Sequence, residues 1–417
     1  MKLSESEIPM THAAPSGAEP ILLAFSGGLD TSFCVPWLKE TYGRPVITVT
    51  VDTGGIDAEG ARLLAERARA LGAIAHHQID AREAYFNQVL KFLIMGNVRR
   101  GAMYPLCVGA ERVLQAQTIA QMALRLKSTV VAHGCTAAGN DQVRFEVALR
   151  TLAPQLEILA PVRDRAFKRA EQLQYLKDHA LPIPPFGAAY SVNRGLWGVT
   201  IGGRETLTSE ASIPESAWVL SKNAFDAPLD PVRHTLGFER GIPALLDGVA
   251  LSAVTIIERL ESLAGPYAIG RGIHVGDTVI GTKGRVAFEA PAAEILLTAH
   301  RELEKLVLTA RQARVKESVA QVYGDLVHEG QHLDPVCRDI EALFSASQAR
   351  VTGSVKLQLR AGSLFIEGVS SPYSLMAASK GVYGEAAGEW TPTDALGFSR
   401  MLALPGIFHQ RAGAQEP

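Results

Sequence analysis

Ile21-Leu22-Leu23-Ala24-Phe25-Ser26-Gly27-Gly28-Leu29-Asp30-Thr31-Ser32 begins with five apolar residues and then reaches two adjacent glycines. Five apolar residues in a row are typical of a short buried strand, and a helical pattern begins at Thr31. Because glycine has no Cβ atom, backbone amides at Gly27 and Gly28 can close around an anion at the start of that helix. The hydroxyls of Ser26 and Ser32 add donors. The segment therefore predicts a phosphate-binding loop between a strand and a helix.

The alternative interpretation is a tight strand-to-helix turn without a ligand, and a glycine pair alone would favour it. Four hydroxyl or carboxylate residues within seven positions favour the phosphate loop instead. No lysine follows the glycines, so the segment is not the Gly-x-x-x-x-Gly-Lys-Ser/Thr loop, and it is not Gly-x-Gly-x-x-Gly. Ser-Gly-Gly-Leu-Asp-Thr-Ser resembles the pyrophosphate-binding loop of the N-type ATP pyrophosphatases, which split ATP into AMP and pyrophosphate. With Ala24 and Phe25 in front, it is most similar to the argininosuccinate synthase family.

Composition indicates an ordinary globular chain of two or three domains. Of the 417 residues, 47% are hydrophobic and 20% are charged, which is close to average usage. A net charge of −2 gives no basic surface for nucleic acid or for an anionic membrane. The four cysteines form no Cys-x-x-Cys pair, which argues against zinc and fits a reducing cytoplasm. We therefore expect a cytoplasmic protein with small-molecule substrates, no membrane or nucleic-acid partner and no metal site formed by side chains alone.

From Ile21 to about residue 180 the chain alternates between strand and helix patterns. We expect strands over 45–51, 73–79 and 128–132, and helices over 33–41 and 111–127. Such βαβ succession predicts an α/β fold with a doubly wound, mostly parallel sheet whose ligands lie at the carboxyl ends of the strands. The resemblance identifies this fold as adenine nucleotide alpha hydrolase-like.

The remaining chain is expected to form a second domain and a C-terminal segment. A proline break at Pro182 to Pro185 indicates a domain boundary. We therefore predict a flexible leader at 1–19, a nucleotide-binding domain at 20–181, a second domain at 182–380 and a C-terminal segment at 381–417. We expect 186–250 to be irregular and poor in strands, helical patterns over 251–263 and 293–323, and a hairpin of 350–359 with 363–369. The resemblance implies an α+β synthetase domain and a C-terminal segment that reaches over a neighbour in a homotetramer. The apolar tail at 401–405 suits such docking, although it could equally fold back on its own chain.

A second polar cluster follows the strand at 128–132. Asn140 or Asp141 can cap the next helix, but capping needs only one such residue. Arg144 lies one helical turn away on the same face, and Thr136 adds a hydroxyl. A carboxylate can hold an amine, and a guanidinium with backbone amides can hold a carboxylate, so the cluster predicts an amino-acid site. Gly-Asn-Asp-Gln-Val-Arg-Phe-Glu, residues 139–146, also matches the argininosuccinate synthase pattern.

The resemblance, which extends over almost the whole chain, implies a role for each of these positions. ATP, with magnesium, would be bound by Ala24, Phe25, Ser26, Gly27, Gly28, Leu29, Asp30, Thr31, Ser32, Val51, His133 and Gly134. Aspartate would be bound by Thr136, Asn140 and Asp141. The acceptor, citrulline in the family, would be bound by Tyr104, Arg112, Asn140, Arg144, Ser191, Thr200, Gly276 and Phe288. The expected catalytic residues are Asp30, Arg112 and Asp141, and Asp30 either orients the loop or helps to bind magnesium.

Departures from the family pattern are concentrated where the family binds citrulline. They are Cys107-Val108-Gly109 for a glycine-threonine-serine block, Asn193-Arg194-Gly195 for an Asp-Glu-Asn run, Thr200 for a serine, Gly276 for a glutamate, Phe288 for a tyrosine and Ala138 for a lysine. These changes remove partners for a charged α-amino group, and a buried ammonium without a partner costs roughly several kcal/mol. Either Asp277 and Glu289 compensate, or the acceptor lacks a free amino-acid end.

The predicted function is an ATP-dependent carbon–nitrogen ligase. Citrulline and aspartate would give argininosuccinate, AMP and pyrophosphate through an adenylated ureido intermediate. The main alternative is the same chemistry on another ureido, amide or carboxylate acceptor. An RNA-modifying pyrophosphatase is disfavoured because the chain lacks a basic surface or a cysteine-based site. A catalytically silent binding protein is disfavoured because the loop hydroxyls are all present.

Overall fold

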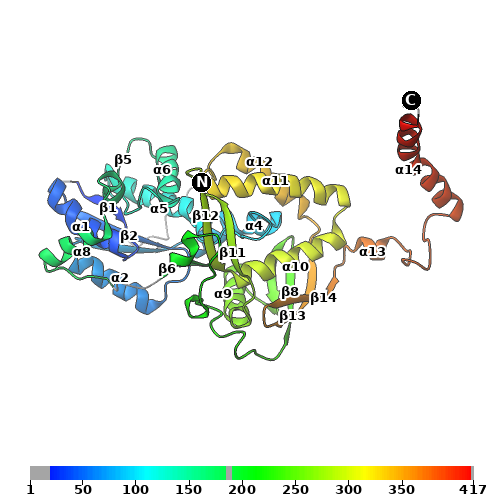
Figure 1. Ribbon diagram of the computed structural model, residues 1–417, viewed down its shortest axis with the longest axis horizontal. Coiled ribbons are helices and arrows are strands. Elements are labelled where there is room, and N and C mark those ends of the chain that lie inside the picture. The colour runs from blue at the N-terminus through cyan, green and yellow to red at the C-terminus, as the bar shows by residue number, and fades with distance from the viewer. Residues whose placement is uncertain (1–18, 185–189, 415–417) are drawn as a thin grey trace.

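The computed structural model describes residues 19–184 and 190–414. Nearly all of the expected leader at 1–19 lies outside this range, as do 185–189 and 415–417. Figure 1 shows an N-terminal part built on a parallel sheet, a second part beside it, and a C-terminal segment that projects away from both. The domain boundaries proposed from the sequence remain predictions.

The N-terminal part contains the predicted parallel sheet. Its five strands lie in the order β3-β2-β1-β4-β5, with bounds Ala75–Asp80, Val46–Asp52, Ile21–Ala24, Val130–Ala132 and Glu157–Leu159. Ile21 pairs with Val46 on one side and with Val130 on the other. The chain therefore leaves β1 toward opposite edges of the sheet, and the point between β1 and β4 is where such folds bind ligands.

Helices cover both faces of this sheet, which confirms the doubly wound arrangement. The side chains of Ile21 and Leu23 pack with Phe33 of α1 in one core, whereas Leu22 packs with Val113 of α5 in the other. This alternation follows from the two-residue period of a strand. The helices of this part are α1 Leu29–Tyr42, α2 Ala58–Ala70, α3 Arg82–Tyr85, the π-helix η1 Phe86–Leu90, α4 Lys91–Gly96, the 3-10 turn η2 Gly109–Glu111, α5 Arg112–Arg125, α6 Asp141–Leu152, α7 Pro161–Asp164 and α8 Arg169–Asp178.

The expectation that 186–250 is poor in strands is wrong. Residues 190–250 contain β6 Tyr190–Gly195, β7 Gly198–Gly203, β8 Val232–Glu239, β9 Ile242–Leu246 and β10 Val249–Ala250, together with the 3-10 turns η3 Arg204–Leu207 and η4 Glu215–Ala217. Strands β6 and β7 join β11 Arg271–Asp277 and β12 Lys283–Glu289 in an antiparallel sheet of order β11-β12-β7-β6. Each strand has only one pair of alternating apolar residues, Tyr190 and Val192 in β6 and Val199 and Ile201 in β7. Such short alternation between glycines and polar residues does not distinguish a strand from a loop.

A third sheet and several long helices complete the second part. The sheet has the order β10-β9-β8-β13-β14, and its hairpin of β13 Gly353–Arg360 and β14 Ser363–Ser370 confirms the predicted one. The helical pattern over 293–323 is two helices, because the hydroxyl of Thr309 accepts from Gln312 N and caps a new helix. The helices, with the 3-10 turn η5, are α9 Ala253–Ala264, η5 Gly265–Tyr267, α10 Pro291–Val307, α11 Ala310–Glu329 and α12 Pro335–Ser347.

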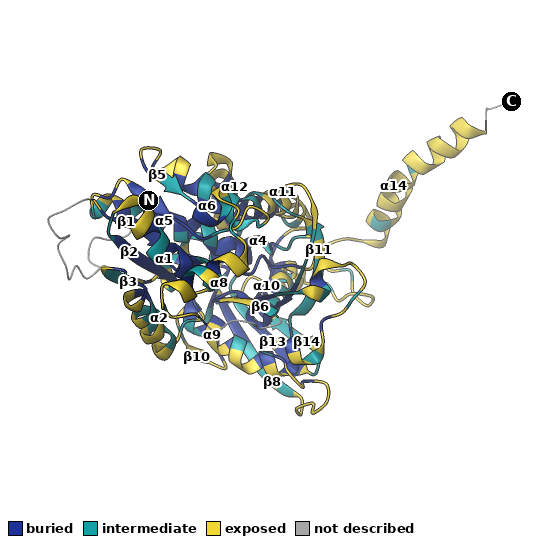
Figure 2. Cartoon of the chain, turned by 60° about the vertical axis from the view of Figure 1, so that its left-hand side comes forward, coloured by how far each residue is buried: buried dark blue, intermediate teal, exposed yellow. Residues whose placement is uncertain are grey.

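The C-terminal segment lies apart from the body of the chain. It contains α13 Leu375–Ala378 and α14 Pro392–Gly413, and no residue of α14 is buried. Figure 2 shows α14 exposed along its length, well away from the sheets. Exposed apolar side chains on it include Leu396, Phe398, Met401, Leu402 and Phe408. In the part of the chain that the structure describes, no helix combines the length and apolarity that crossing a bilayer requires.

Candidate active site

A cavity of about 640 Å³ lies at the carboxyl ends of β1, β2 and β4. Its floor comes from the loop after β1, and its walls come from the starts of α5 and α6 and from β6 of the second part. The lining residues that the sequence did not single out as ligands include Thr53, Glu111, Gln115, Cys135, Arg169, Asn193 and Arg194. Two parts of the chain thus enclose one site, in the position expected for a doubly wound sheet.

The loop after β1 has the geometry of an anion cradle. Gly27 has a φ of +74°, a conformation that side chains rarely adopt. The carbonyl oxygen of Gly27 accepts from Arg67 Nη1 at 2.7 Å and from Ser32 Oγ at 3.4 Å. Gly28 precedes α1 without a capping side chain, so the first amides of α1 have no intrahelical acceptor. Together with the helix dipole, these free amides favour phosphate oxygens.

We expect Gly27→Ala to weaken ATP binding by about tenfold or more, because the new Cβ would be both strained and crowded. A Cβ at Gly27 would lie 2.3 Å from Leu64 Cδ2 at a φ of +74°. Gly202→Ala in β7 is the control, since Gly202 is not among the residues that line the cavity and its Cβ would meet no atom within 4 Å. Calorimetric titration of each variant with magnesium and ATP measures the effect. Equal affinities for the two variants would contradict the role given to Gly27.

The second part closes over this cavity through the loop that follows β2. Leu196 N donates to Thr53 O at 2.9 Å, and Gly54 has a φ of +108° with the Leu196 backbone 2.5 Å from where a Cβ would stand. No side chain fits at Gly54, so the β2 loop and the β6–β7 turn lie in direct contact. This contact explains how β6 comes to line a cavity that belongs mainly to the parallel sheet.

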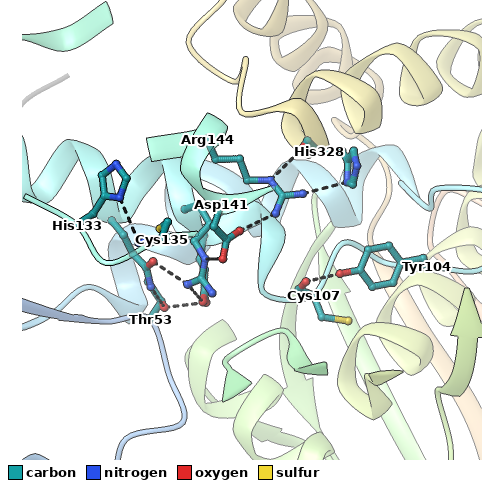
Figure 3. Close-up of polar contacts among 11 residues, drawn as sticks. Thr53, Tyr104, Cys107, His133, Cys135, Asp141, Arg144 and His328 are labelled. Atoms are coloured by element: carbon teal, nitrogen blue, oxygen red, sulfur yellow. Dashed lines mark hydrogen bonds and ion pairs between the residues drawn. The ribbon is translucent and has the colours of Figure 1, made fainter. Parts of the chain in front are cut away.

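A row of alternating charges runs from the cavity toward the second part. Arg112 Nη1 donates to Glu111 Oε1 at 2.9 Å, and Arg112 Nε donates to Asp141 Oδ2 at 2.9 Å. Asp141 Oδ1 also accepts from Arg144 Nη1 at 2.8 Å (Figure 3). Thr53 Oγ1 donates to Glu111 Oε2 at 2.7 Å. The row thus joins the end of β2, the start of α5 and the start of α6.

Burial and neighbouring charges shift the pKa values of this row. Burial opposes ionisation of Asp141, but the guanidinium groups of Arg112 and Arg144 outweigh it and lower the pKa of this carboxyl. Burial raises the pKa of Glu111 to about 7, although Arg112 acts in the opposite direction. Asp141 is therefore a carboxylate at neutral pH with 37% of its side chain exposed, whereas Glu111 is fully enclosed and changes charge near neutrality.

The raised pKa of Glu111 predicts a loss of stability as pH rises. Between its unfolded pKa of 4.5 and its folded value of about 7, the folded chain holds a proton that the unfolded chain has released. The free energy of unfolding should therefore fall by about 2 kcal/mol from pH 5.5 to pH 8 on account of this group. Urea denaturation at both pH values, with and without Glu111→Gln, measures it. The variant should lack this part of the decrease, and an unchanged pH profile would contradict the assignment.

Beyond Asp141 the row continues into the second part. Arg144 is buried, and its Nε donates to the carbonyl oxygen of His328 at 2.7 Å, near the C-terminal end of α11. A cation at that end is favoured by the helix dipole. Close by, the ring of Tyr104 stacks on His274 at 5.5 Å and meets Phe288 edge-on at 5.2 Å. The hydroxyl of Tyr104 donates to Cys107 O at 2.5 Å.

Most of the residues predicted for ATP line the cavity. The structure brings together there Ala24, Phe25, Ser26, Gly28, Leu29, Asp30, Thr31, Val51, His133 and Gly134, as well as Arg112, Asp141 and Ser191. Gly27 and Ser32 lie behind the loop and support it. The Nε2 atom of His133 is buried without a hydrogen-bond partner in the described residues, and burial lowers the pKa of His133 to about 4. Because Nδ1 of this neutral imidazole accepts from Cys135 N at 3.3 Å, Nε2 carries the proton and can donate to a ligand.

The other predicted residues lie outside the cavity lining. Asn140 Oδ1 accepts from Val279 N at 2.9 Å, and Thr136 is exposed on the loop before α6. Thr200 lies inside the antiparallel sheet, paired with Asn193 and Phe288. Gly276 lies on β11 beside His274. Tyr104, Arg144 and Phe288 form the region beyond Asp141 described above.

Sequence reasoning missed Thr53 and Glu111. Thr53 stands directly after β2, so the rule that ligands gather at the carboxyl ends of parallel strands could have selected it. Glu111 precedes Arg112 in a 3-10 turn, and no local pattern distinguishes it from a solvated charge. Nowhere in residues 19–184 and 190–414 do three or more His, Cys, Asp or Glu side chains form a group that could hold a metal. Magnesium held mainly by ATP phosphates needs only one or two carboxylates, and Asp30 lines the cavity at the loop.

Comparisons with known proteins point to one family over most of the chain. The model described as "Arginosuccinate synthase N-terminal HUP domain" matches residues 20–182, and the one described as "Arginosuccinate synthase C-terminal domain" matches residues 190–408. The argininosuccinate synthase of Xanthomonas campestris is 39% identical over 404 residues, covering 94% of this chain and 98% of the relative. That of Pyrobaculum aerophilum is 39% identical over 394 residues, with the same coverage. That of Methanocaldococcus jannaschii is 38% identical over 357 residues, covering 85% and 89%.

Proposed function

The chain belongs to the argininosuccinate synthase family of ATP-dependent ligases, and we propose that it joins the amine of aspartate to a ureido acceptor, with citrulline as the acceptor named by the family's activity. AMP and pyrophosphate are the other products. One observation carries this proposal: a phosphate loop and a paired carboxylate and guanidinium, Asp141 and Arg112, line the same cavity. The first suits the nucleotide, and the second suits the amino-acid donor.

The reaction would take two steps, activation of the acceptor by ATP and then attack by the amine of aspartate. The loop from Ser26 to Ser32 holds the β- and γ-phosphates through its free amides, and the ureido oxygen of the acceptor attacks the α-phosphate. Pyrophosphate leaves, and the acceptor is then an adenylate. The amine of aspartate next attacks the activated carbon, AMP departs, and the amine loses a proton. When bound with ATP, Mg²⁺ neutralises phosphate charge, and Asp30 is the carboxylate of the loop that would help to hold it.

Positioning accounts for most of what the chain's own residues do. Asp141 is ionised and partly exposed to the cavity, so it can orient the ammonium or amine of aspartate. Arg112 is held at Nε and Nη1 by Asp141 and Glu111, which fixes it beside the reacting groups without a change of rotamer. We propose Thr136 and Asn140 as further aspartate contacts, on the strength of the match with the family pattern.

Likeness to the family also supports a proposal for assembly and location. We propose that the chain works in the cytoplasm as a homotetramer in which α14 reaches a neighbouring subunit. The support is the absence of any buried residue on α14 and its row of exposed apolar side chains, which a second copy would cover. Light scattering on the full chain tests the assembly, and removal of residues 381–417 should reduce the particle mass.

The decisive assay is pyrophosphate release with ATP, magnesium and aspartate, with and without citrulline. Citrulline-dependent release together with argininosuccinate in the product mixture is the expected result. Release that depends on aspartate and another ureido, amide or carboxylate compound would keep the ligase chemistry and change the acceptor. An enzyme that binds ATP but shows no aspartate-dependent release with any such acceptor would contradict the proposed function.

A further inference from the structure

Glu111 is a buried carboxylate in the cavity lining to which the steps of the proposed reaction give no part. It is 3% exposed and ends the 3-10 turn η2, directly before α5. Its Oε2 accepts from Thr53 Oγ1 at 2.7 Å, and its Oε1 accepts from Arg112 Nη1 at 2.9 Å. Because burying a carboxylate costs free energy, a carboxylate kept inside a cavity is a candidate for a functional role.

The neighbours of Glu111 leave room for its carboxylate and hold its partner. A Cβ at Gly195, the last residue of β6, would clash with Oε2 of Glu111. The carboxylate therefore fills space that a side chain at this end of β6 would take. Gln115 Oε1 accepts from Arg112 Nη1 at 2.8 Å, and Gln115 Nε2 donates to Thr53 Oγ1 at 3.1 Å. Glu111 and Gln115 thus hold the same nitrogen of Arg112.

Charges along the row balance only when Glu111 is ionised. Arg112 and Arg144 pair with Asp141 at 2.9 Å and 2.8 Å. These three side chains carry two positive charges and one negative charge, so one positive charge is in excess. Ionised Glu111 cancels it. Since water screens charges weakly in a site as enclosed as this one, the cancellation acts strongly on a charged ligand beside Asp141.

The other titratable groups that face Glu111 do not supply this balance. They are Asp52 at the end of β2, Tyr85 of α3 and Cys107. Burial raises the pKa values of Tyr85 and Cys107, so both are uncharged at neutral pH. Burial also raises the pKa of Asp52, whose Oδ1 accepts from Gly54 N at 2.8 Å. Within the described part of the chain, the carboxylates that pair with Arg112 are Glu111 and Asp141.

We propose that Glu111 is a positioning residue for the donor, and that its negative charge allows the row to accept the ammonium of aspartate beside Asp141. The inference rests on the proposed function, which places the donor amine at Asp141. Ionised Glu111 engages Arg112, so more of the Asp141 charge is available to the ammonium. With Glu111 neutral, the ammonium would meet two guanidinium groups and a single carboxylate.

Aspartate and succinate differ only in the amino group, so the ratio of their affinities isolates the ammonium. Each is titrated calorimetrically into the full chain with magnesium and a non-hydrolysable ATP analogue. Glu111→Gln keeps the size of the side chain and removes its charge, and it should lower the preference for aspartate about fivefold or more. Glu66→Gln removes an exposed carboxylate that pairs with Arg62 on α2, and as the control it should leave the preference unchanged. Equal changes of both affinities in Glu111→Gln would indicate a purely structural role and overturn the proposal.

The pH dependence of the unmodified chain is a second test. Because burial raises the pKa of Glu111 to about 7, a change from pH 6.5 to pH 8 ionises this group, and the preference for aspartate should rise about twofold or more. His133 lines the same cavity, but its pKa of about 4 leaves it neutral throughout this range. Thr53→Val removes a donor to the ionised carboxylate, so it should move the rise to higher pH. A flat profile, or a rise that persists in Glu111→Gln, would contradict the proposal.

Failure of the inference and failure of the proposed function give different results. If the chain releases pyrophosphate with aspartate and citrulline, but Glu111→Gln leaves the preference for aspartate unchanged, the ligase stands and the role of Glu111 is lost. If the preference depends on Glu111 but aspartate-dependent pyrophosphate release never occurs, the amino-acid site stands and the ligase is lost. If aspartate does not bind, both are lost.

Discussion

Replacing Asp141 by alanine is expected to reduce aspartate-dependent pyrophosphate release at least about a hundredfold. Asp141 is the only carboxylate that contacts both Arg112 and Arg144 among the described ion pairs. Its loss removes the anion that would orient the amine of aspartate. It also leaves two guanidinium groups of the row without their shared partner, and like charges in a partly buried site then repel each other and the incoming ammonium.

The measurement needs controls for folding and for ATP binding. Affinity for magnesium and ATP should stay within about threefold, because the phosphate loop lies at the other end of the cavity. Asp141→Asn keeps the shape but loses the charge, so it should resemble the alanine variant in turnover. Glu146→Gln lies on the same helix, outside the cavity lining, with Arg150 and Arg163 as partners, and should retain activity. A fully active Asp141→Ala enzyme would contradict the amino-acid site.

The phosphate loop could be predicted from sequence because its determinants are local. Apolar residues, paired glycines and hydroxyls follow each other within twelve positions, and each acts on its immediate neighbours. The parallel sheet followed from βαβ succession for the same reason. Thr53 could have been predicted because it follows the carboxyl end of a strand. Its contact with Glu111 could not, because it joins residues 58 positions apart.

The region beyond Asp141 was not predictable in this way, since its contacts connect distant parts of the chain. Asn140 bonds Val279, 139 positions away, and Arg144 bonds His328, 184 positions away. Strand β6 was missed because its alternation is limited to Tyr190 and Val192 in a mostly exposed, polar sequence, although it forms one wall of the cavity. Family likeness selected several of these positions, but only the structure reveals that Arg144 and His274 occupy the space beside Gly109 and Gly276.

The second large effect concerns a buried polar network in which Glu304 of α10 is the central acceptor. Its Oε2 accepts from Lys316 Nζ and from Asn97 Nδ2, each at 2.6 Å, and its Oε1 accepts from Gln348 Nε2 at 2.6 Å. Lys316 is 1% exposed. Burial opposes the charge on Glu304, but His300 and Lys316 outweigh it and lower the pKa of this carboxyl.

Glu304→Gln should lower the free energy of unfolding by about 3–5 kcal/mol, because it leaves the Lys316 ammonium buried without its counter-charge. Urea denaturation followed by circular dichroism measures the change. Glu302→Gln is the matched control on the same helix, since Glu302 pairs with Lys305, which is 63% exposed; it should cost less than about 1 kcal/mol. A loss in Glu304→Gln no larger than in the control would contradict the importance of the network.

The same variant should also affect the acceptor more than ATP. Lys316 donates to Met95 O of α4 at 2.7 Å, and Asn97 follows α4 directly, so the network fixes α4 against α10 and α11. Tyr104, which is predicted to bind the acceptor, lies only seven residues after Asn97. Loosening this junction should therefore raise the KM for the acceptor several-fold while the KM for ATP changes little, because the phosphate loop belongs to a different core. Equal changes in both KM values would indicate general loosening of the chain instead of a displaced acceptor site.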